Sequence, residues 1–139
     1  MKRYDAYLTI SRASMLRYNR ITNVLCAMDP QAIANVYEQL EPKFEEAQRE
    51  IGWPDHTFRD VSKKAILHLL EMPIPRRTPV LESESGALYR LKDPNLESLS
   101  AAQKHLLRMG PRNARAMQRQ LRAIGEATRL LPKAQAATE

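Results

Sequence analysis

Nine prolines, set against only four glycines, divide this chain of 139 residues into separate segments. Proline breaks a helix interior because it lacks the backbone N–H, yet it is tolerated at the first helical position. Between the prolines the chain is rich in alanine, leucine, glutamate, glutamine and arginine, which favour helix. A chain of this length can bury a core as one domain. We therefore predict an all-α fold: a helical bundle with a Pro-rich extended arm and a C-terminal helical hairpin.

Residues 1–72 are predicted to form a helical body. Asp29-Pro30 ends a first helix and begins a second, since Asp is a good N-cap and Pro suits the first helical position. Pro42 either kinks this second helix or begins a third one, for which Gly52 is a suitable C-terminal cap. The predicted helices of the body span residues 4–28, 30–40, 42–51 and about 58–71. The apolar positions predicted to face inward on the second helix are Ile33, Val36, Tyr37 and Leu40.

Residues 73–92 differ in character from the rest of the chain. Pro73, Pro75 and Pro79 fall within seven residues, and each pushes the residue before it out of the helical region. We predict an extended, Pro-rich linker or arm. Residues 87–91 favour a short strand, which either pairs with another chain or is simply extended.

Residues 93–139 are predicted to form a basic helical hairpin with a frayed tail. Asp93-Pro94 and Ser100 are cap signals for two short helices, as Thr57 is for the last helix of the body. Gly110-Pro111 closes the second short helix and opens the last helix, which is predicted over residues 112–131.

The net charge of the chain lies entirely in its last 39 residues. Residues 1–100 hold 14 basic and 14 acidic residues, whereas residues 101–139 hold eight basic residues and two acidic ones. A concentrated positive charge of this kind indicates an anionic partner: nucleic acid, an acidic protein face or a membrane surface. Arginine, rather than lysine, favours recognition of phosphate or carboxylate, because its guanidinium group binds both bidentately.

The last helix is predicted to have two opposed faces. An apolar seam recurs at steps of three and four residues, and arginines follow the same steps two residues earlier, which is about 200° of helical rotation away. The seam consists of Ala114, Met117, Leu121, Ile124, Thr128 and Leu131. With the preceding helix included, the candidate partner-binding or nucleic-acid-binding residues are Arg108, Arg112, Arg115, Arg119, Arg122 and Arg129.

Two other interpretations of this region stay open. Residues 100–121 permit a helix-turn-helix motif whose second helix would read base edges. An acidic face formed by Glu38, Glu41 and Glu45 is a possible counterpart for the arginines, within one chain or from a neighbouring chain. The side chains available for base reading are Arg112, Asn113, Arg115, Gln118 and Arg119.

The sequence contains no pattern that favours catalysis, a cofactor or a metal ion. His56, His68 and His105 lack metal-ligand spacing, and neither a P-loop nor a dinucleotide-binding glycine motif is present. Cys26, the one cysteine, is predicted to be a small buried residue in a reducing compartment. We expect no membrane span, no signal peptide and no small-molecule substrate, and an intracellular location, in the cytoplasm or in a particle assembled there.

These observations favour a non-enzymatic structural or adaptor subunit of a larger assembly, such as a virus or phage particle. The expected partners are copies of the same chain or other protein subunits, docked through the bifacial helix and the arm. The alternative is a nucleic-acid-binding protein, possibly regulatory, whose arginines contact phosphates.

Overall fold

The computed structural model describes residues 8–52, 55–85 and 88–134, and over these residues the protein is mostly helical with one small antiparallel sheet. The prediction of an all-α fold is therefore right for most of the chain and wrong for its three strands. In chain order the elements are β1 (Leu8–Thr9), α1 (Arg12–Leu16), α2 (Asn19–Ala27), α3 (Pro30–Glu50), α4 (Phe58–Leu70), β2 (Val80–Ser85), β3 (Leu88–Leu91), α5 (Pro94–Glu97), α6 (Ala101–Arg108) and α7 (Pro111–Ala127).

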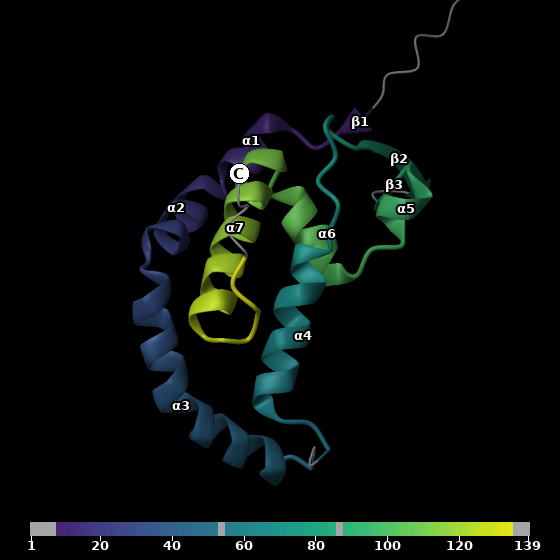
Figure 1. Cartoon of the computed structure of the whole chain (residues 1–139). Coiled ribbons are helices and arrows are strands. Elements are labelled where there is room, and N and C mark those ends of the chain that lie inside the picture. Colours follow the sequence, from purple (N-terminus) through teal and green to yellow (C-terminus); the bar gives the residue numbers. More distant parts are fainter. Residues whose placement is uncertain (1–7, 53–54, 86–87, 135–139) are drawn as a thin grey trace, which may run out of the picture.

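Helix α7 is the centre of the molecule. It packs against α2 and α3 on one side and against α4 and α6 on the other (Figure 1). The main hydrophobic cluster combines residues from all three predicted segments of the chain, so the arm and the C-terminal helices pack on the helical body. Its buried members are Met72, Leu91, Leu96, Leu106, Leu107, Met109 and Ala114.

The predicted helix starts are confirmed by their caps. Asp29 accepts hydrogen bonds from two backbone N–H groups at the start of α3, and Thr57 accepts one at the start of α4. Asp93 caps α5 in the same way, and Ser100 forms a complete capping box with Gln103 at the start of α6. These side chains satisfy N–H groups that have no partner within the helix, which is why they mark helix starts reliably.

The prediction of one helix over residues 4–28 is wrong. Residues 4–7 lie outside the described part, β1 pairs with β2, and Ser11 then caps the short helix α1. The chain turns at Arg17 before α2 begins. The side-chain amide of Asn113 in α7 spans this break, because it donates to the carbonyl of Met15 at 3.3 Å and to Oδ1 of Asn19 at 3.0 Å.

Helix α3 runs without interruption through Pro42, so of the two alternatives predicted there a new helix is wrong, and the proline lies inside one continuous helix. Proline removes one backbone hydrogen bond, and packing of α3 on α4 and α7 offsets that loss. Gly52 follows the helix with a φ of 85°, as expected of a glycine cap.

The predicted extended arm contains a β-hairpin. Strands β2 and β3 pair antiparallel, with Leu81 opposite Leu91, and β1 forms the third strand of the sheet. The strand predicted near residues 87–91 therefore finds its partner within the chain rather than in another chain. Leu91 joins the hydrophobic core, which anchors the hairpin to the helices.

The last helix ends earlier than predicted. Helix α7 stops at Ala127, and Arg129 takes a left-handed conformation with a φ of 57°. The chain then folds back, so that the backbone N–H of Leu131 donates to the carbonyl of Gly125 at 2.8 Å. The side chain of Leu131 occupies the space that a Cβ at Gly125 would fill, which explains this glycine inside the helix.

None of the helices in the described ranges combines the length and apolar character needed to cross a membrane.

Candidate partner-binding surfaces

Side-chain amides hold the flanks of α7 to its neighbours. Nε2 of Gln118 donates to the carbonyls of Leu69, Leu70 and Met72 at 3.0, 3.3 and 2.9 Å, where α4 ends. On the other flank, Nε2 of Gln120 donates to two carbonyls at the end of α2, each at 2.9 Å. Carbonyls at helix ends lack partners within the helix, so these bonds fix both neighbouring helices to α7.

The exposed side of α7 carries the arginine stripe, which we define as Arg112, Arg115, Arg119 and Arg122. All four side chains are exposed, and none takes part in an ion pair or hydrogen bond within the described residues. The opposed apolar face is buried or half-buried, as predicted. The stripe is therefore unneutralised charge on a helix that is held rigidly on its other sides.

Two of the six predicted binding residues lie off the stripe. Arg108 is exposed at the end of α6, and Arg129 follows the end of α7 in its left-handed conformation. The prediction that Arg129 extends the stripe fails because the helix ends before it. Along the stripe, Arg115, Arg119 and Arg122 line a shallow hollow of about 340 Å³ beside Leu70 of α4, and oxyanions of phosphate or carboxylate suit such a surface.

The helix-turn-helix interpretation loses two of its five base-reading side chains. Asn113 is only 5% exposed, and its amide is used within the protein. Gln118 is occupied by the end of α4. Direct base reading from this helix would therefore depend on arginines alone.

The predicted acidic face engages α4 rather than the arginine stripe of the same chain. Oε1 of Glu45 accepts from the backbone N–H of Phe58 at 2.6 Å, at the positive end of α4. Glu41 forms an ion pair with Arg59 at 3.1 Å, and Arg59 also donates to the carbonyl of Thr128 at 2.8 Å. Of the three predicted glutamates, only Glu38 is exposed. Docking of this face on the arginines of a neighbouring chain stays a prediction.

An apolar groove follows α3 on the side away from the core. Its volume is about 490 Å³, and it ends at an aromatic stack in which Phe58 lies 4.5 Å from Phe44 and 5.9 Å from Tyr37, centroid to centroid. Burial is the main cause that raises the pKa of Tyr37. Val36 and Leu40 were predicted to face inward but are 54% and 40% exposed, so that part of the prediction is wrong.

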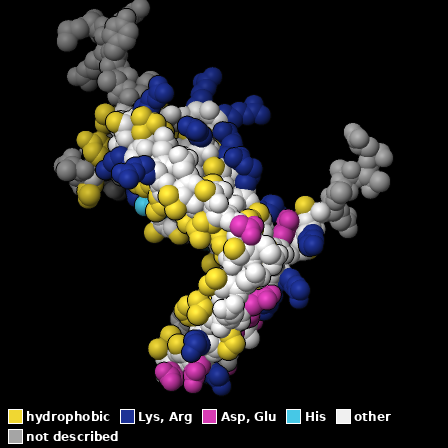
Figure 2. Space-filling model, turned by 90° about the vertical axis from the view of Figure 1, so that its left-hand side faces the viewer, with side chains coloured by type: hydrophobic (Ala, Val, Ile, Leu, Met, Phe, Trp, Pro, Cys, Tyr) yellow, Lys and Arg dark blue, Asp and Glu magenta, His cyan; other side chains and the backbone are white. Residues whose placement is uncertain are grey.

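The exposed apolar side chains continue from α3 onto α2. In Figure 2 hydrophobic side chains form a band from the upper body down to the lower half of the molecule. We call this surface the apolar band; its residues are Ile21, Val24, Met28, Val36, Leu40 and Phe44, each of them at least 40% exposed. The helical spacing of these apolar residues is visible in the sequence. It does not show which side of α2 and α3 the rest of the chain covers.

The two ends of this surface carry opposite charge. Residues 12–27 contain three arginines and no acid, whereas residues 29–50 contain six acids and two bases. In Figure 2 Lys and Arg gather over the upper body, while Asp and Glu gather in the lower half. The apolar band therefore runs from a basic end to an acidic end.

Within the described ranges no group of three or more His, Cys, Asp and Glu could hold a metal ion. His68 bonds Ser100 at 2.7 Å, and His105 packs edge-on against Tyr18. Cys26 is exposed on α2, so the prediction that it is buried is wrong.

The chain belongs to the family described as "Protein of unknown function (DUF3014)", which matches residues 1–125. No curated protein and no solved structure matches the chain.

Proposed function

We propose that this protein is a non-enzymatic structural or adaptor subunit that pairs with a second copy of itself through the apolar band and presents its arginine stripe to an anionic partner. An intracellular assembly, of which a virus or phage particle is one example, is the proposed setting.

The observation that carries this proposal is the apolar band. Six large apolar side chains, at helical spacing on two helices, stay exposed although the chain has an ordinary core. Soluble monomers rarely leave a contiguous apolar patch of this kind open, and such patches mark sites of protein association. Phosphates and bases of a nucleic acid would not bury it.

Charge complementarity favours a second copy as the occupant. If two bands pack antiparallel about a two-fold axis near the junction of α2 and α3, the basic segment 12–27 of one copy faces the acidic segment 29–50 of the other. In that acidic segment Glu41 and Glu45 are bonded to α4, and Glu38, Glu46 and Glu50 are exposed. A self-complementary surface of this type closes as a dimer. Attraction between the two ends would also set the direction of pairing.

Sedimentation of purified protein, with purified variants in parallel, tests the proposal. The unmodified chain should sediment as a dimer that weakens with added salt. The double change Val36→Gln and Leu40→Gln should raise the dissociation constant at least tenfold, because it removes the centre of the apolar contact. The matched control, Asn35→Ala with Gln39→Ala, lies on α3 away from the band and should leave it unchanged. A monomeric wild type, or equal association of all three proteins, contradicts the proposal.

Nucleic acid is the second candidate for the anionic partner. The observation in its favour is that every cation of the stripe is an arginine with no ion-pair partner among the residues that the structure describes. Contact of four arginines with phosphates would cost about two orders of magnitude in DNA affinity between roughly 50 and 200 mM salt. Arg119→Gln with Arg122→Gln should make that dependence shallower. No DNA binding at the lower salt concentration would assign the stripe to an acidic protein.

A further inference from the structure

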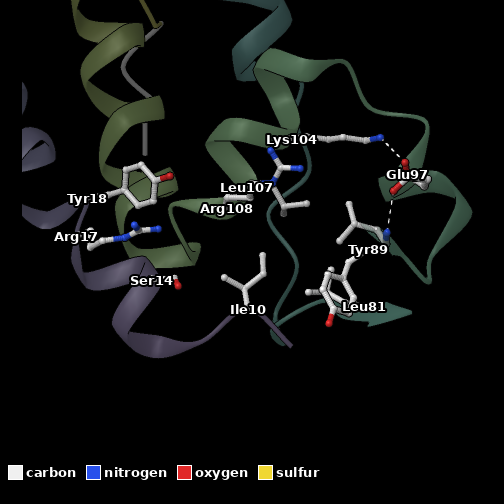
Figure 3. A pocket seen from close by; sticks show the side chains of 11 residues that line it. Ile10, Ser14, Arg17, Tyr18, Leu81, Tyr89, Glu97, Lys104, Leu107 and Arg108 are labelled. Atoms are coloured by element: carbon white, nitrogen blue, oxygen red, sulfur yellow. Dashed lines mark hydrogen bonds and ion pairs between the residues drawn. The ribbon is translucent and has the colours of Figure 1, made fainter. Parts of the chain in front are cut away.

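A second hollow, separate from the apolar band and the arginine stripe, lies where α1 and α6 meet the sheet (Figure 3). Its volume is about 270 Å³, just below the usual range of small-molecule pockets, about 300–1,000 Å³. A pocket of this size suits a ligand of a few carbon atoms or a single side chain.

The floor of this pocket is apolar and firmly held. Leu91 of β3 and Leu107 of α6 are 8% and 4% exposed, and both belong to the hydrophobic core. Ile10 and Leu81 add further apolar side chains to the lining, beside Tyr18 and Tyr89. Because the core sets these positions, the floor exists without a ligand and costs little reorganisation on binding.

Two arginines from different elements stand over this floor. Arg17 comes from the turn between α1 and α2, and Arg108 is the last residue of α6. Both line the pocket, and neither has an ion-pair or hydrogen-bond partner within the described residues. Their guanidinium groups therefore remain available to an anion.

The third cation of the pocket is already neutralised. In Figure 3 Lys104 reaches away from the two arginines to Glu97, and their Nζ–Oε1 distance is 2.5 Å. The other carboxylate oxygen of Glu97 accepts from the backbone N–H of Leu91 at 2.8 Å. The bond from Lys104, followed by the bond from Leu91, lowers the pKa of Glu97, so this carboxyl stays charged and keeps Lys104 occupied.

The break between α1 and α2 is what places Arg17 here. Asn113 holds the break through Met15 and Asn19, and a Cβ at Gly110 would lie only 2.8 Å from Sδ of Met15. A continuous helix over this region, as the sequence pattern predicts, would have no such turn. The helix break, which the local sequence pattern does not predict, therefore lies at the pocket. Such disagreements between local pattern and structure are typical of functional sites.

We propose that this pocket binds a monocarboxylate that carries a short apolar group. The carboxylate lies between the guanidinium groups of Arg17 and Arg108, and the apolar group rests on Leu91 and Leu107. Each of the two guanidinium groups can donate to one oxygen of a single carboxylate, and guanidinium binds a carboxylate with strong, charge-assisted hydrogen bonds. The apolar floor favours an organic acid over inorganic phosphate, because phosphate has no apolar group to cover the floor and would leave it exposed to water. This inference goes beyond the proposed self-association and does not depend on it.

Titration followed by NMR tests the pocket with defined probes. Hexanoate represents a free acid, and acetyl-Ala-Ala-Leu with a free C-terminus represents a peptide end. Hexanamide and the amidated peptide are the neutral controls. At least one acid should bind with a dissociation constant of about 1 mM or tighter, a reasonable affinity for so small a ligand, and should shift resonances of Leu91 and Leu107. Its neutral control should bind at least tenfold more weakly.

Variants assign the binding to the pocket. Arg17→Gln and Arg108→Gln should each weaken binding of the acid about tenfold or more, since each removes a hydrogen bond to a charged group. Arg77→Gln, an exposed arginine in the loop before β2 and outside the pocket, is the matched control and should leave the affinity unchanged. Binding of hexanoate alone would identify a free acid as the ligand, and binding of the peptide alone a chain end. Absence of binding by both acids, or equal loss in all three variants, would overturn the proposal.

Discussion

Helices α3 and α7 have similar amphipathic patterns, but the fold treats them differently. α7 is flanked by four other helices, and its amides bond the ends of α2 and α4. α3 packs on α4 and α7 with one side and leaves Val36, Leu40 and Phe44 exposed on another. The outer side of α7 is charged, whereas the outer surface of α3 includes an apolar strip.

The difference shows that apolar periodicity in the sequence predicts which face of a helix is to be buried. It does not predict whether the chain itself or a partner covers that face. On α7 the apolar seam is covered by the chain itself. On α3 the seam is wider than the surface that α4 and α7 offer, and the remainder forms the apolar band. We infer that α7 is the structural centre of the chain and that α3, together with α2, carries the surface for self-association.

The glycines beside these two helices should differ most in their tolerance of substitution. Gly110 precedes α7 with a φ of 84° and a ψ of 160°, a conformation that is essentially restricted to glycine, and a Cβ there would strike Met15. Gly110→Ala should lower the free energy of unfolding by about 2–4 kcal/mol. Gly52→Ala, where a Cβ would meet nothing within 4 Å, should cost about 1–2 kcal/mol from backbone strain alone. Equal losses in urea denaturation would argue against α7 as the centre.

An amide on α7 should matter more than one on α3. Gln118→Ala removes the donor to three carbonyls at the end of α4 and should cost about 1–2 kcal/mol of unfolding free energy. Gln39→Ala, an exposed glutamine on α3, should change it by less than about 0.5 kcal/mol. Urea denaturation of both variants measures the difference, and a Gln118→Ala protein as stable as Gln39→Ala would contradict the assignment.

The apolar band should contribute little to the stability of the single chain. Val36→Gln replaces a side chain that is 54% exposed, so the unfolding free energy extrapolated to low protein concentration should change by less than about 0.5 kcal/mol. The same measurement at high protein concentration should show a larger loss, because association stabilises the folded state by mass action. A loss of unfolding free energy that does not depend on protein concentration would show that Val36 stabilises the single chain as a core residue does.

The smallest expected effect is a pH dependence at the inner edge of the groove. Burial raises the pKa of Tyr37 in the folded protein. Its contribution to stability is therefore complete below the ordinary pKa of tyrosine, about 10, and is lost as the pH rises through that value towards the raised one. Tyr37→Phe should lose less stability than wild type between pH 8 and 11 in parallel thermal melts, values chosen to bracket that titration. Equal losses of stability in wild type and Tyr37→Phe would show that burial does not change the ionisation of Tyr37.

Local signals in the sequence predicted the parts of the fold that depend on local chemistry. Asp29, Thr57 and Ser100 bond N–H groups a few residues away, so each helix start could be predicted from its own neighbourhood. The pairing of Leu8 with Leu81 depends on residues 73 positions apart, and no local pattern reports it. The early end of α7 likewise depends on Leu130 and Leu131 folding back into the core.

The candidate site divides in the same way. The arginine stripe follows from helical spacing and was predicted, apart from Arg129, whose place depends on where α7 ends. The apolar band and the carboxylate pocket depend on which surfaces remain uncovered after folding. The pocket in particular requires Arg17 and Arg108, which are far apart in the sequence, to meet over a floor of core residues.

The most direct test of the account uses the natural cysteine. Cys26 is the one cysteine of the chain, is exposed, and lies one residue before the end of α2, so along the chain it is near the junction of α2 and α3. A spin label on Cys26 should report a single well-defined distance between two copies in a dipolar electron resonance measurement, and Val36→Gln with Leu40→Gln should abolish it. If the labelled protein shows no distance between copies, or if the double change leaves that distance intact, the claim that this protein self-associates through the apolar band is contradicted.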